Sequence, residues 1–228
     1  MIFADLPYNA DYKGKTAKQL SIPNDNLGKH FAAFLSSACR AMLDVNNGAI
    51  YVCMSSKELH TLYEAFTEAG GHFSTFLIWA KNTFTLGRSD YQRQFECLLY
   101  GWKEGCGHYW SGDRTQGDVW FFDKPSANKE HPTMKPLALV ERAISNSTRK
   151  GDVVLDPFAG AGSTLLAAER TGRRARVVEI NPVYADVIIK RWQSYTGGVA
   201  RLDPGGQSFS EVTEQRQSAG ASGQEQVA

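Results

Sequence analysis

The segment that constrains the fold most runs from residue 153 to residue 168. An apolar run at 153–155 leads into the turn Asp156-Pro157-Phe158-Ala159-Gly160-Ala161-Gly162-Ser163-Thr164, and the next residues, 165–168, are typical of a helix. This order predicts a strand, a glycine turn and a helix. Two glycines let the backbone pass close to a ligand, and the helix N-terminus behind them favours negative charge. The segment therefore predicts an α/β protein with a ligand site at this turn.

Two positions near the turn indicate which ligand it takes. Leu165 stands where a dinucleotide-binding fingerprint has its third glycine, so a pyrophosphate site is disfavoured. Glu179 lies nineteen residues after Gly160, at the end of a second apolar run at 175–178. An acidic side chain in that place accepts hydrogen bonds from both hydroxyls of a ribose. The pattern predicts a nucleoside without phosphates, which is the outline of an S-adenosylmethionine site.

The first half of the chain alternates between strand and helix patterns. Strands are expected at 2–4, 49–54, 73–79 and 95–100, and helices at 31–42 and 57–69. A last helix is expected over 184–195. Strands that alternate with helices predict a mostly parallel sheet with helices on both faces. Residues 1–202 are expected to form this domain, whereas 203–228, rich in Gly, Ser and Gln, is expected to be disordered.

Composition excludes several classes of protein. The chain has 228 residues, 42% of them hydrophobic, which is enough to bury a full core. A net charge of +1 indicates neither a basic nucleic-acid coat nor an acidic tail protein. The four cysteines lack CxxC spacing, and no secretory leader or membrane span is expected. The expectation is a reduced, cytosolic protein without a metal and without a membrane partner.

Near the other end of the chain, Asp5-Leu6-Pro7-Tyr8 carries groups suited to chemistry on an amine. An exocyclic amine of a nucleobase is a poor nucleophile because its lone pair is delocalised into the ring, so a site needs acceptors that orient its hydrogens. Asp5 offers a carboxylate, and Leu6, biased to extended conformations by Pro7, offers a carbonyl. Tyr8 offers an aromatic face on which a flipped base stacks.

These two segments, together with His131-Pro132-Thr133-Met134-Lys135-Pro136, occur in the order of a known family. Over residues 2–196 the chain resembles the beta group of DNA amino-methyltransferases, which methylate adenine N6 or cytosine N4 with S-adenosylmethionine. The resemblance implies a Rossmann-like methyltransferase fold in circularly permuted order, with the catalytic half first. It also implies double-stranded DNA as partner, in the cytoplasm of a bacterial or bacteriophage host cell, and leaves a homodimer open.

The resemblance implies roles for individual residues. The catalytic loop corresponds to Asp5, Leu6, Pro7 and Tyr8. The cofactor side comprises Thr133, Lys135, Asp156, Pro157, Phe158, Gly160, Gly162, Ser163, Thr164, Glu179 and Asn181. Cytosine members of the family more often carry Ser at the position of Asp5, so adenine N6 is the leading interpretation. Cytosine N4 is the nearest alternative.

Two features depart from the family pattern. Leu6 stands where proline is usual, and only four residues precede Asp5, where the family usually has a Gly-Asp segment and a further strand. Either the sequence is a fragment that begins at an internal methionine, or the cofactor pocket has one open side and binds weakly. A third interpretation follows from both departures, namely a catalytically silent DNA-binding remnant.

The stretch 82–128, between the catalytic loop and the cofactor half, is polar, aromatic and irregular. Basic residues alternate in it with Tyr and Trp, a mixture that suits contacts to phosphates and bases. We therefore expect a target-recognition insert here, with Arg88 and Arg93 as DNA contacts. The alternative is a surface elaboration with buried aromatic residues.

Overall fold

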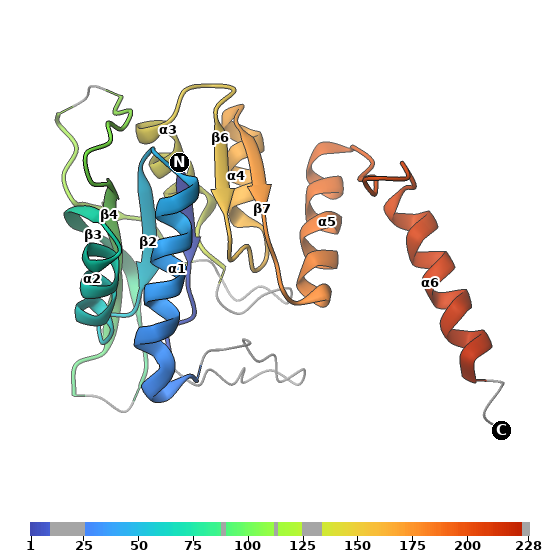
Figure 1. The fold of residues 1–228 in the computed structure, drawn as a ribbon, viewed down its shortest axis with the longest axis horizontal. Helices are drawn as coiled ribbons and strands as arrows, with labels where there is room; N and C mark the ends of the chain where they lie inside the picture. Colours follow the sequence, from blue (N-terminus) through green and yellow to red (C-terminus); the bar gives the residue numbers. More distant parts are fainter. Residues whose placement is uncertain (10–25, 88–89, 112–113, 125–133, 225–228) are drawn as a thin grey trace.

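A seven-stranded sheet forms the centre of the protein (Figure 1). The computed structural model describes residues 1–9, 26–87, 90–111, 114–124 and 134–224. The strands are β1 (Ile2–Asp5), β2 (Ile50–Met54), β3 (Gly71–Thr85), β4 (Arg93–Lys103), β5 (Val119–Phe121), β6 (Val153–Asp156) and β7 (Arg174–Val177). Their order across the sheet is β5-β3-β4-β2-β1-β6-β7. The first strand of the chain, β1, is therefore an interior strand of the sheet and not an edge strand.

Neighbouring strands run mostly parallel, as the sequence predicted, and β4 is the exception. β1 is parallel to β2 and β6, β6 is parallel to β7, and β3 is parallel to β5. β4 is antiparallel to both of its neighbours, β2 and β3. The amino end of β4 therefore lies at the end of the sheet where the other strands have their carboxyl ends.

Helices cover both faces of the sheet, which confirms the predicted fold class. The helices of the described residues are η1 (Gly28–His30), α1 (Phe31–Val45), α2 (Leu59–Glu68), α3 (Leu137–Ser147), α4 (Ser163–Thr171), α5 (Pro182–Thr196) and α6 (Phe209–Gln224). In Figure 1, α1 and α2 lie in front of the sheet and α3 and α4 lie behind it. Within the described residues, no helix combines the length and the apolar character needed to cross a membrane.

The core consists of two apolar clusters, one on each face of the sheet. Residues of α1 and α2 pack on one face with Ile2 and Ala4, and residues of α3 and α4 pack on the other face with Phe3. Successive side chains of a strand point to opposite faces, so β1 contributes to both clusters. β2, buried over its whole length, has the unbroken apolar sequence expected of a strand covered on both sides.

The strand order reverses at the centre of the sheet, between β1 and β6. β1 and β6 are parallel neighbours. The sheet continues from β1 to β2 on one side and from β6 to β7 on the other. Open α/β sheets bind ligands at such a reversal, in the crevice outside the carboxyl ends of the strands. The loop that follows Asp5 and the glycine turn that follows Asp156 both begin here.

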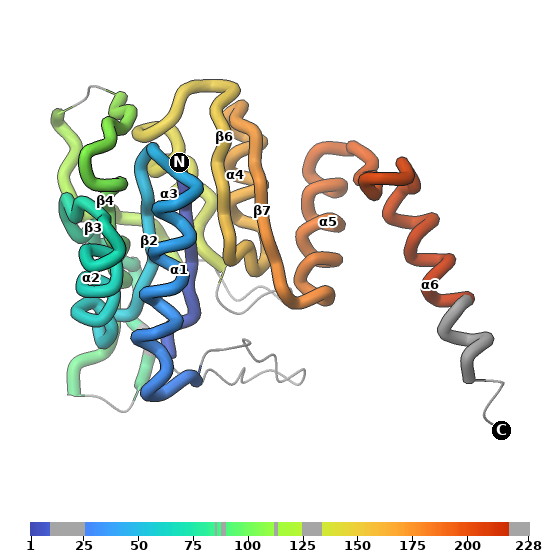
Figure 2. The backbone as a smooth tube through the Cα atoms, viewed as in Figure 1, coloured from blue at the N-terminus to red at the C-terminus, as the bar shows by residue number. Residues whose placement is uncertain are grey.

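The C-terminal stretch differs from the disorder that we expected over 203–228. Helix α6 occupies much of it and stands apart from the sheet (Figure 2). A capping box begins this helix: the Ser208 amide donates to Glu211 Oε2 at 2.6 Å, and the Glu211 amide donates to Ser208 Oγ at 3.3 Å. The prediction of disorder rested on the average composition of the segment. A helix cap depends instead on two particular residues three positions apart, so average polarity does not reveal it.

Residues 82–128 also contribute more to the sheet than expected. They include the end of β3, all of β4 and all of β5. β5 was not predicted because it has three residues, of which only Trp120 is buried. The Trp120 ring packs in the cluster on the α3 side. The part of 82–128 that remains for contact with a partner is therefore smaller than the sequence indicated.

Candidate active site

Asp5, at the end of β1, is paired with Lys135, which precedes α3. Lys135 Nζ donates to both carboxylate oxygens of Asp5, at 2.7 Å each, and lies 3.2 Å from Glu96 Oε2. The Lys135 side chain is 6% exposed. A buried ammonium group needs such partners because an isolated charge in the interior costs a large free energy. Lys135, expected on the cofactor side, thus contacts the loop that begins at Asp5.

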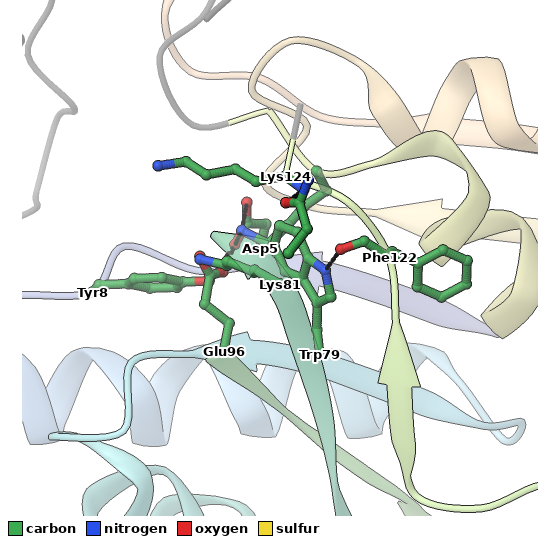
Figure 3. A network of polar contacts seen from close by, with 9 residues as sticks. Asp5, Tyr8, Trp79, Lys81, Glu96, Phe122 and Lys124 are labelled. Carbon is green, nitrogen blue, oxygen red and sulfur yellow. Dashed lines mark hydrogen bonds and ion pairs between the residues drawn. The ribbon is translucent and has the colours of Figure 1, made fainter. Parts of the chain in front are cut away.

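Glu96 and Lys81 complete this cluster (Figure 3). Lys81 Nζ lies 2.5 Å from Glu96 Oε1 and 4.6 Å from the centre of the Trp79 ring. In Figure 3 the side chains of Asp5, Lys81 and Glu96 point toward one another. The cluster therefore holds two carboxylates and two ammonium groups, whose formal charges cancel.

Glu96 and Lys81 were absent from the residues singled out in the sequence. Glu96 lies in a run of strand residues, and its position at the end of the sheet that carries Asp5 depends on β4 being antiparallel. Trp79 is its register partner on β3, which brings Lys81 to the same end. The available signal was a charged residue beside the buried run Cys97 to Tyr100. A charge at such a place is expected to have a partner.

The Tyr8 hydroxyl lies between the two carboxylates. It is 3.1 Å from Asp5 Oδ1 and 2.9 Å from Glu96 Oε2. Lys135 Nζ lies 5.1 Å from the centre of the Tyr8 ring, which is within the range of a cation–π contact. Tyr8 is thus held at its hydroxyl end and contacted on one face of its ring, so its orientation relative to Asp5 is defined.

The cluster shifts the pKa values of its members. Burial raises the pKa of Asp5, Lys135 opposes this shift, and the charge of Glu96 adds to it. Burial also acts to raise the pKa of Glu96, but the attraction of Lys135 and Lys81 outweighs it and lowers that pKa to about 2. Burial acts to lower the pKa of Lys135, and the two carboxylates raise it on balance. Glu96 is therefore a fixed anion at neutral pH, and Asp5 is the more basic carboxylate.

The Leu6 side chain belongs to the core. It is 2% exposed and lies in the cluster on the α1 side, whereas Pro7 is half-buried. Any contribution of Leu6 to chemistry is therefore limited to its backbone. The aliphatic residue at this position, which departs from the family pattern, fills space between the catalytic loop and the helices.

Within the glycine turn, several residues expected to face a cofactor hold the turn itself together. Asp156, 2% exposed, accepts from the Phe158 amide at 3.0 Å and from the Thr164 hydroxyl at 2.6 Å. The Ser163 hydroxyl donates to the Lys135 carbonyl at 3.3 Å, which ties the turn to the catalytic side. Burial raises the pKa of Asp156 to about 7. These side chains are placed to shape the turn.

Glu179, just beyond β7, closes the glycine turn. Its Oε2 accepts from the Gly160 amide and its Oε1 from the Asn181 amide, each at 2.8 Å. The Asn181 side chain in turn accepts from the Val183 amide at 3.0 Å and caps α5. A carboxylate has about four lone-pair sites, so both oxygens keep acceptor capacity. Glu179 is half-buried and remains accessible to a ligand.

Other expected site residues have different surroundings. The Phe158 ring stands edge-on to Phe34, with 6.0 Å between ring centres, and Pro157 is half-buried beside it. Arg93 is exposed at the start of β4. Thr133 and Arg88 lie outside the described residues. Among the residues that the structure describes, no group of three or more His, Cys, Asp or Glu side chains is placed to hold a metal ion.

A family model and curated relatives match most of the chain. The family model, described as DNA methylase, matches residues 1–191. Type II methyltransferase M2.MboI of Moraxella bovis is 26% identical over 224 residues, covering 86% of this chain and 81% of the relative. Type II methyltransferase M.HpaI of Haemophilus parainfluenzae is 27% identical over 227 residues, covering 89% of this chain and 71% of the relative.

Solved structures match a similar share of the chain. The M1.HpyAVI–SAM complex is 25% identical, with a TM-score of 0.63, and the match covers 83% of this chain and 87% of that chain. The PvuII DNA methyltransferase, described as cytosine-N4-specific, has a TM-score of 0.66 at 18% identity, covering 84% of this chain and 78% of that chain. At that identity the second match concerns the fold alone.

Proposed function

The chain belongs to the DNA methylase family, and on this premise we propose that it transfers a methyl group from S-adenosylmethionine to the N6 amine of adenine in duplex DNA. The observation that carries the proposal is the meeting of two loops. The Asp5 loop and the glycine turn leave parallel neighbours, β1 and β6, at the same end of the sheet. A methyl donor held by one loop thus lies beside the acceptors of the other.

The residues of the glycine turn fit the proposed cofactor. Gly160 and Gly162 have φ values of 52° and 79°, which glycine adopts without strain. A Cβ at Gly162 would lie 3.1 Å from Ile188. Glu179 offers acceptor capacity for ribose hydroxyls, and its bonds to the Gly160 and Asn181 amides fix the direction of its carboxylate. When bound, the cofactor supplies an electrophilic methyl group on a sulfonium.

The protein's own groups then orient the nucleophile. The Asp5 carboxylate and the Leu6 carbonyl accept the hydrogens of the target amine, so that its lone pair is directed toward the methyl donor. The Lys135 ammonium contacts one face of the Tyr8 ring, and we assign base stacking to the other face. The preference for adenine over cytosine rests on the carboxylate at position 5, where the family's cytosine enzymes more often have Ser.

One experiment tests this function. The protein is incubated with duplex DNA of mixed sequence and methyl-labelled S-adenosylmethionine, and the nucleosides are digested and separated by mass. Labelled N6-methyl-2′-deoxyadenosine is the expected product. Labelled N4-methyl-2′-deoxycytidine would move the assignment to the cytosine amine, and unlabelled DNA that still binds the protein would indicate a silent DNA-binding chain. We place this activity in a bacterial cytoplasm because the relatives named above are bacterial.

Glu179→Ala is expected to weaken S-adenosylmethionine binding by on the order of 2 to 3 kcal/mol, because two hydrogen bonds to a charged acceptor are lost. The change also removes the acceptor of the Gly160 amide and loosens the turn. Isothermal titration calorimetry measures the effect. The exposed Glu68 at the end of α2 provides a matched control, and Glu68→Ala is expected to bind normally. Equal affinity in both variants would remove Glu179 from the site.

Replacing Arg88 and Arg93 together by Ala is expected to lower duplex affinity and to reduce the dependence of binding on salt by about one unit of slope for each lost phosphate contact. Cofactor binding is expected to be unchanged because Arg93 lies at the start of β4 and not in the glycine turn. Fluorescence anisotropy over a range of salt concentrations measures the slope. Unchanged DNA affinity would contradict the recognition role of 82–128.

A further inference from the structure

Glu96 receives several of the contacts that hold the catalytic cluster together. Lys81 Nζ lies 2.5 Å from its Oε1, whereas Lys135 Nζ and the Tyr8 hydroxyl lie 3.2 Å and 2.9 Å from its Oε2. Its side chain is 20% exposed, so these contacts are partly shielded from water. Lys135 and Tyr8 also contact Asp5. The two carboxylates therefore share their donors.

The sharing changes what Asp5 has left to offer a substrate. The Tyr8 hydroxyl carries one proton, so it donates to one carboxylate at a time, and Glu96 is the nearer one at 2.9 Å against 3.1 Å. Lys135 is held by Asp5 at 2.7 Å and by Glu96 at 3.2 Å. Each donor drawn toward Glu96 leaves a lone pair of Asp5 available for a hydrogen from another molecule.

We infer that Glu96 is a positioning residue of this site, which draws the Tyr8 hydroxyl proton and part of the Lys135 charge away from Asp5 and so leaves Asp5 able to take a proton from the target amine. The inference rests on the proposed function. In the step itself, the amine lone pair forms the new N–C bond, and the electron pair of the broken S–C bond stays on sulfur. An N–H proton passes to an Asp5 oxygen while its bonding pair stays on nitrogen, and Asp5 later releases the proton to water.

The surroundings of Asp5 set the direction of the expected change. The titratable groups around it are Tyr8, Cys53 on β2, Glu96 on β4 with its partner Lys81 on β3, Lys135 before α3 and Asp156 at the end of β6. Burial holds the pKa of Cys53 well above its usual range, so the thiol is neutral. Without the Glu96 charge, no neighbouring anion repels the Asp5 carboxylate. Lys135 and Tyr8 are then attracted more strongly to Asp5. Both effects stabilise the ionised form of Asp5.

The test is a titration of Asp5 in the full-length protein without cofactor. Carbon-13 NMR follows the carboxyl carbon of labelled aspartate, and the Asp5 signal is assigned by its loss in Asp5→Asn. Glu96→Gln is expected to lower the pKa of Asp5. The same variant is expected to shift the acidic limb of the single-turnover pH profile to lower pH and to reduce the plateau rate about tenfold, because a weaker base takes the amine proton more slowly.

A second variant is expected to shift the pKa of Asp5 in the opposite direction. Lys81→Met removes a cation from Glu96, leaves Lys135 more strongly attracted to Glu96, and is expected to raise the pKa of Asp5. Impaired folding does not move the two variants in opposite directions. Glu104→Gln is the matched control, because Glu104 lies beyond the far end of β4 and pairs with His72 at 3.1 Å. Its Asp5 titration is expected to equal that of the wild type.

Two results would overturn the inference. One is an Asp5 pKa in Glu96→Gln that equals or exceeds the wild-type value, and the other is a lowered Asp5 pKa in Lys81→Met. A wild-type protein that methylates no DNA contradicts the proposed function instead, and the titration of the cofactor-free protein still decides the role of Glu96.

Discussion

Asp5→Ala is expected to lower the single-turnover rate of DNA methylation by about a hundredfold or more, while cofactor and DNA affinities change little. The effect falls on the rate because the amine changes shape and develops charge in the transition state, and the carboxylate interacts with it most strongly there. Asp5 is suited to this role because it lies at the carboxyl end of β1, beside the glycine turn after β6. Rapid-quench kinetics and separate binding titrations measure the two quantities.

Asp5→Asn is the matched variant, because it keeps the size of the side chain and one acceptor oxygen but loses the charge. Its rate is expected to lie between those of Asp5→Ala and the wild type. Asp5→Ala leaves Lys135 with Glu96 as its remaining carboxylate partner, so thermal unfolding of each variant is recorded alongside. Full methylation of duplex DNA by either Asp5 variant would contradict the proposed mechanism.

Lys135→Met is expected to destabilise the fold by about 3 to 5 kcal/mol at pH 8, because it leaves Asp5 and Glu96 as neighbouring anions without their shared cation. Methylation is expected to be lost as well, since Asp5 then holds a proton more tightly. The destabilisation is expected to shrink as the pH falls. With Lys135 present, the pKa of Glu96 is lowered to about 2, so its stabilising effect is complete above the unfolded value near 4.5 and is lost as the pH falls through 2.

Urea unfolding at pH 8 and at pH 5 measures this prediction. In the variant both carboxyl groups take up protons at higher pH than in the wild type, which relieves their repulsion, so the deficit at pH 5 is smaller. Lys57→Met serves as control because Lys57 is exposed before α2, and it is expected to leave stability unchanged at both pH values. A deficit that is independent of pH would indicate lost packing in place of a lost ion pair.

Much of the fold follows from local patterns in the sequence. The glycine turn between β6 and α4 and the apolar runs of β1 and β2 are found where they were expected. These elements are predictable because backbone preferences and hydrophobic spacing act over a few residues. The helices on both faces follow from the alternation of strands and helices, whereas the permuted order of the two halves was implied by the resemblance to the family. The capping box at Ser208 was equally local and was overlooked in favour of composition.

The candidate site was predictable only in part. The sequence placed Asp5 and Tyr8 in one loop and Glu179 after the next strand beyond the glycine turn, and the structure brings the two loops to one end of the sheet. It did not indicate that Asp156, Ser163 and Thr164 would turn inward to hold the glycine turn. Which of two faces a polar side chain takes depends on what packs against it, and that is set by other parts of the chain.

The sequence by itself determined most of the strands and helices, the ligand class of the glycine turn and the chemical groups of the Asp5 loop, because each depends on residues close together in the chain. Tertiary structure alone decided that Lys135 meets Asp5, 130 positions away, and that Lys81 and Glu96 complete the cluster. Those contacts require β4 to be antiparallel and Glu96 to pair in register with Trp79. Strand direction and register are set by how the whole sheet buries its apolar surface. That burial depends on residues far apart in the chain, so no short segment predicts it.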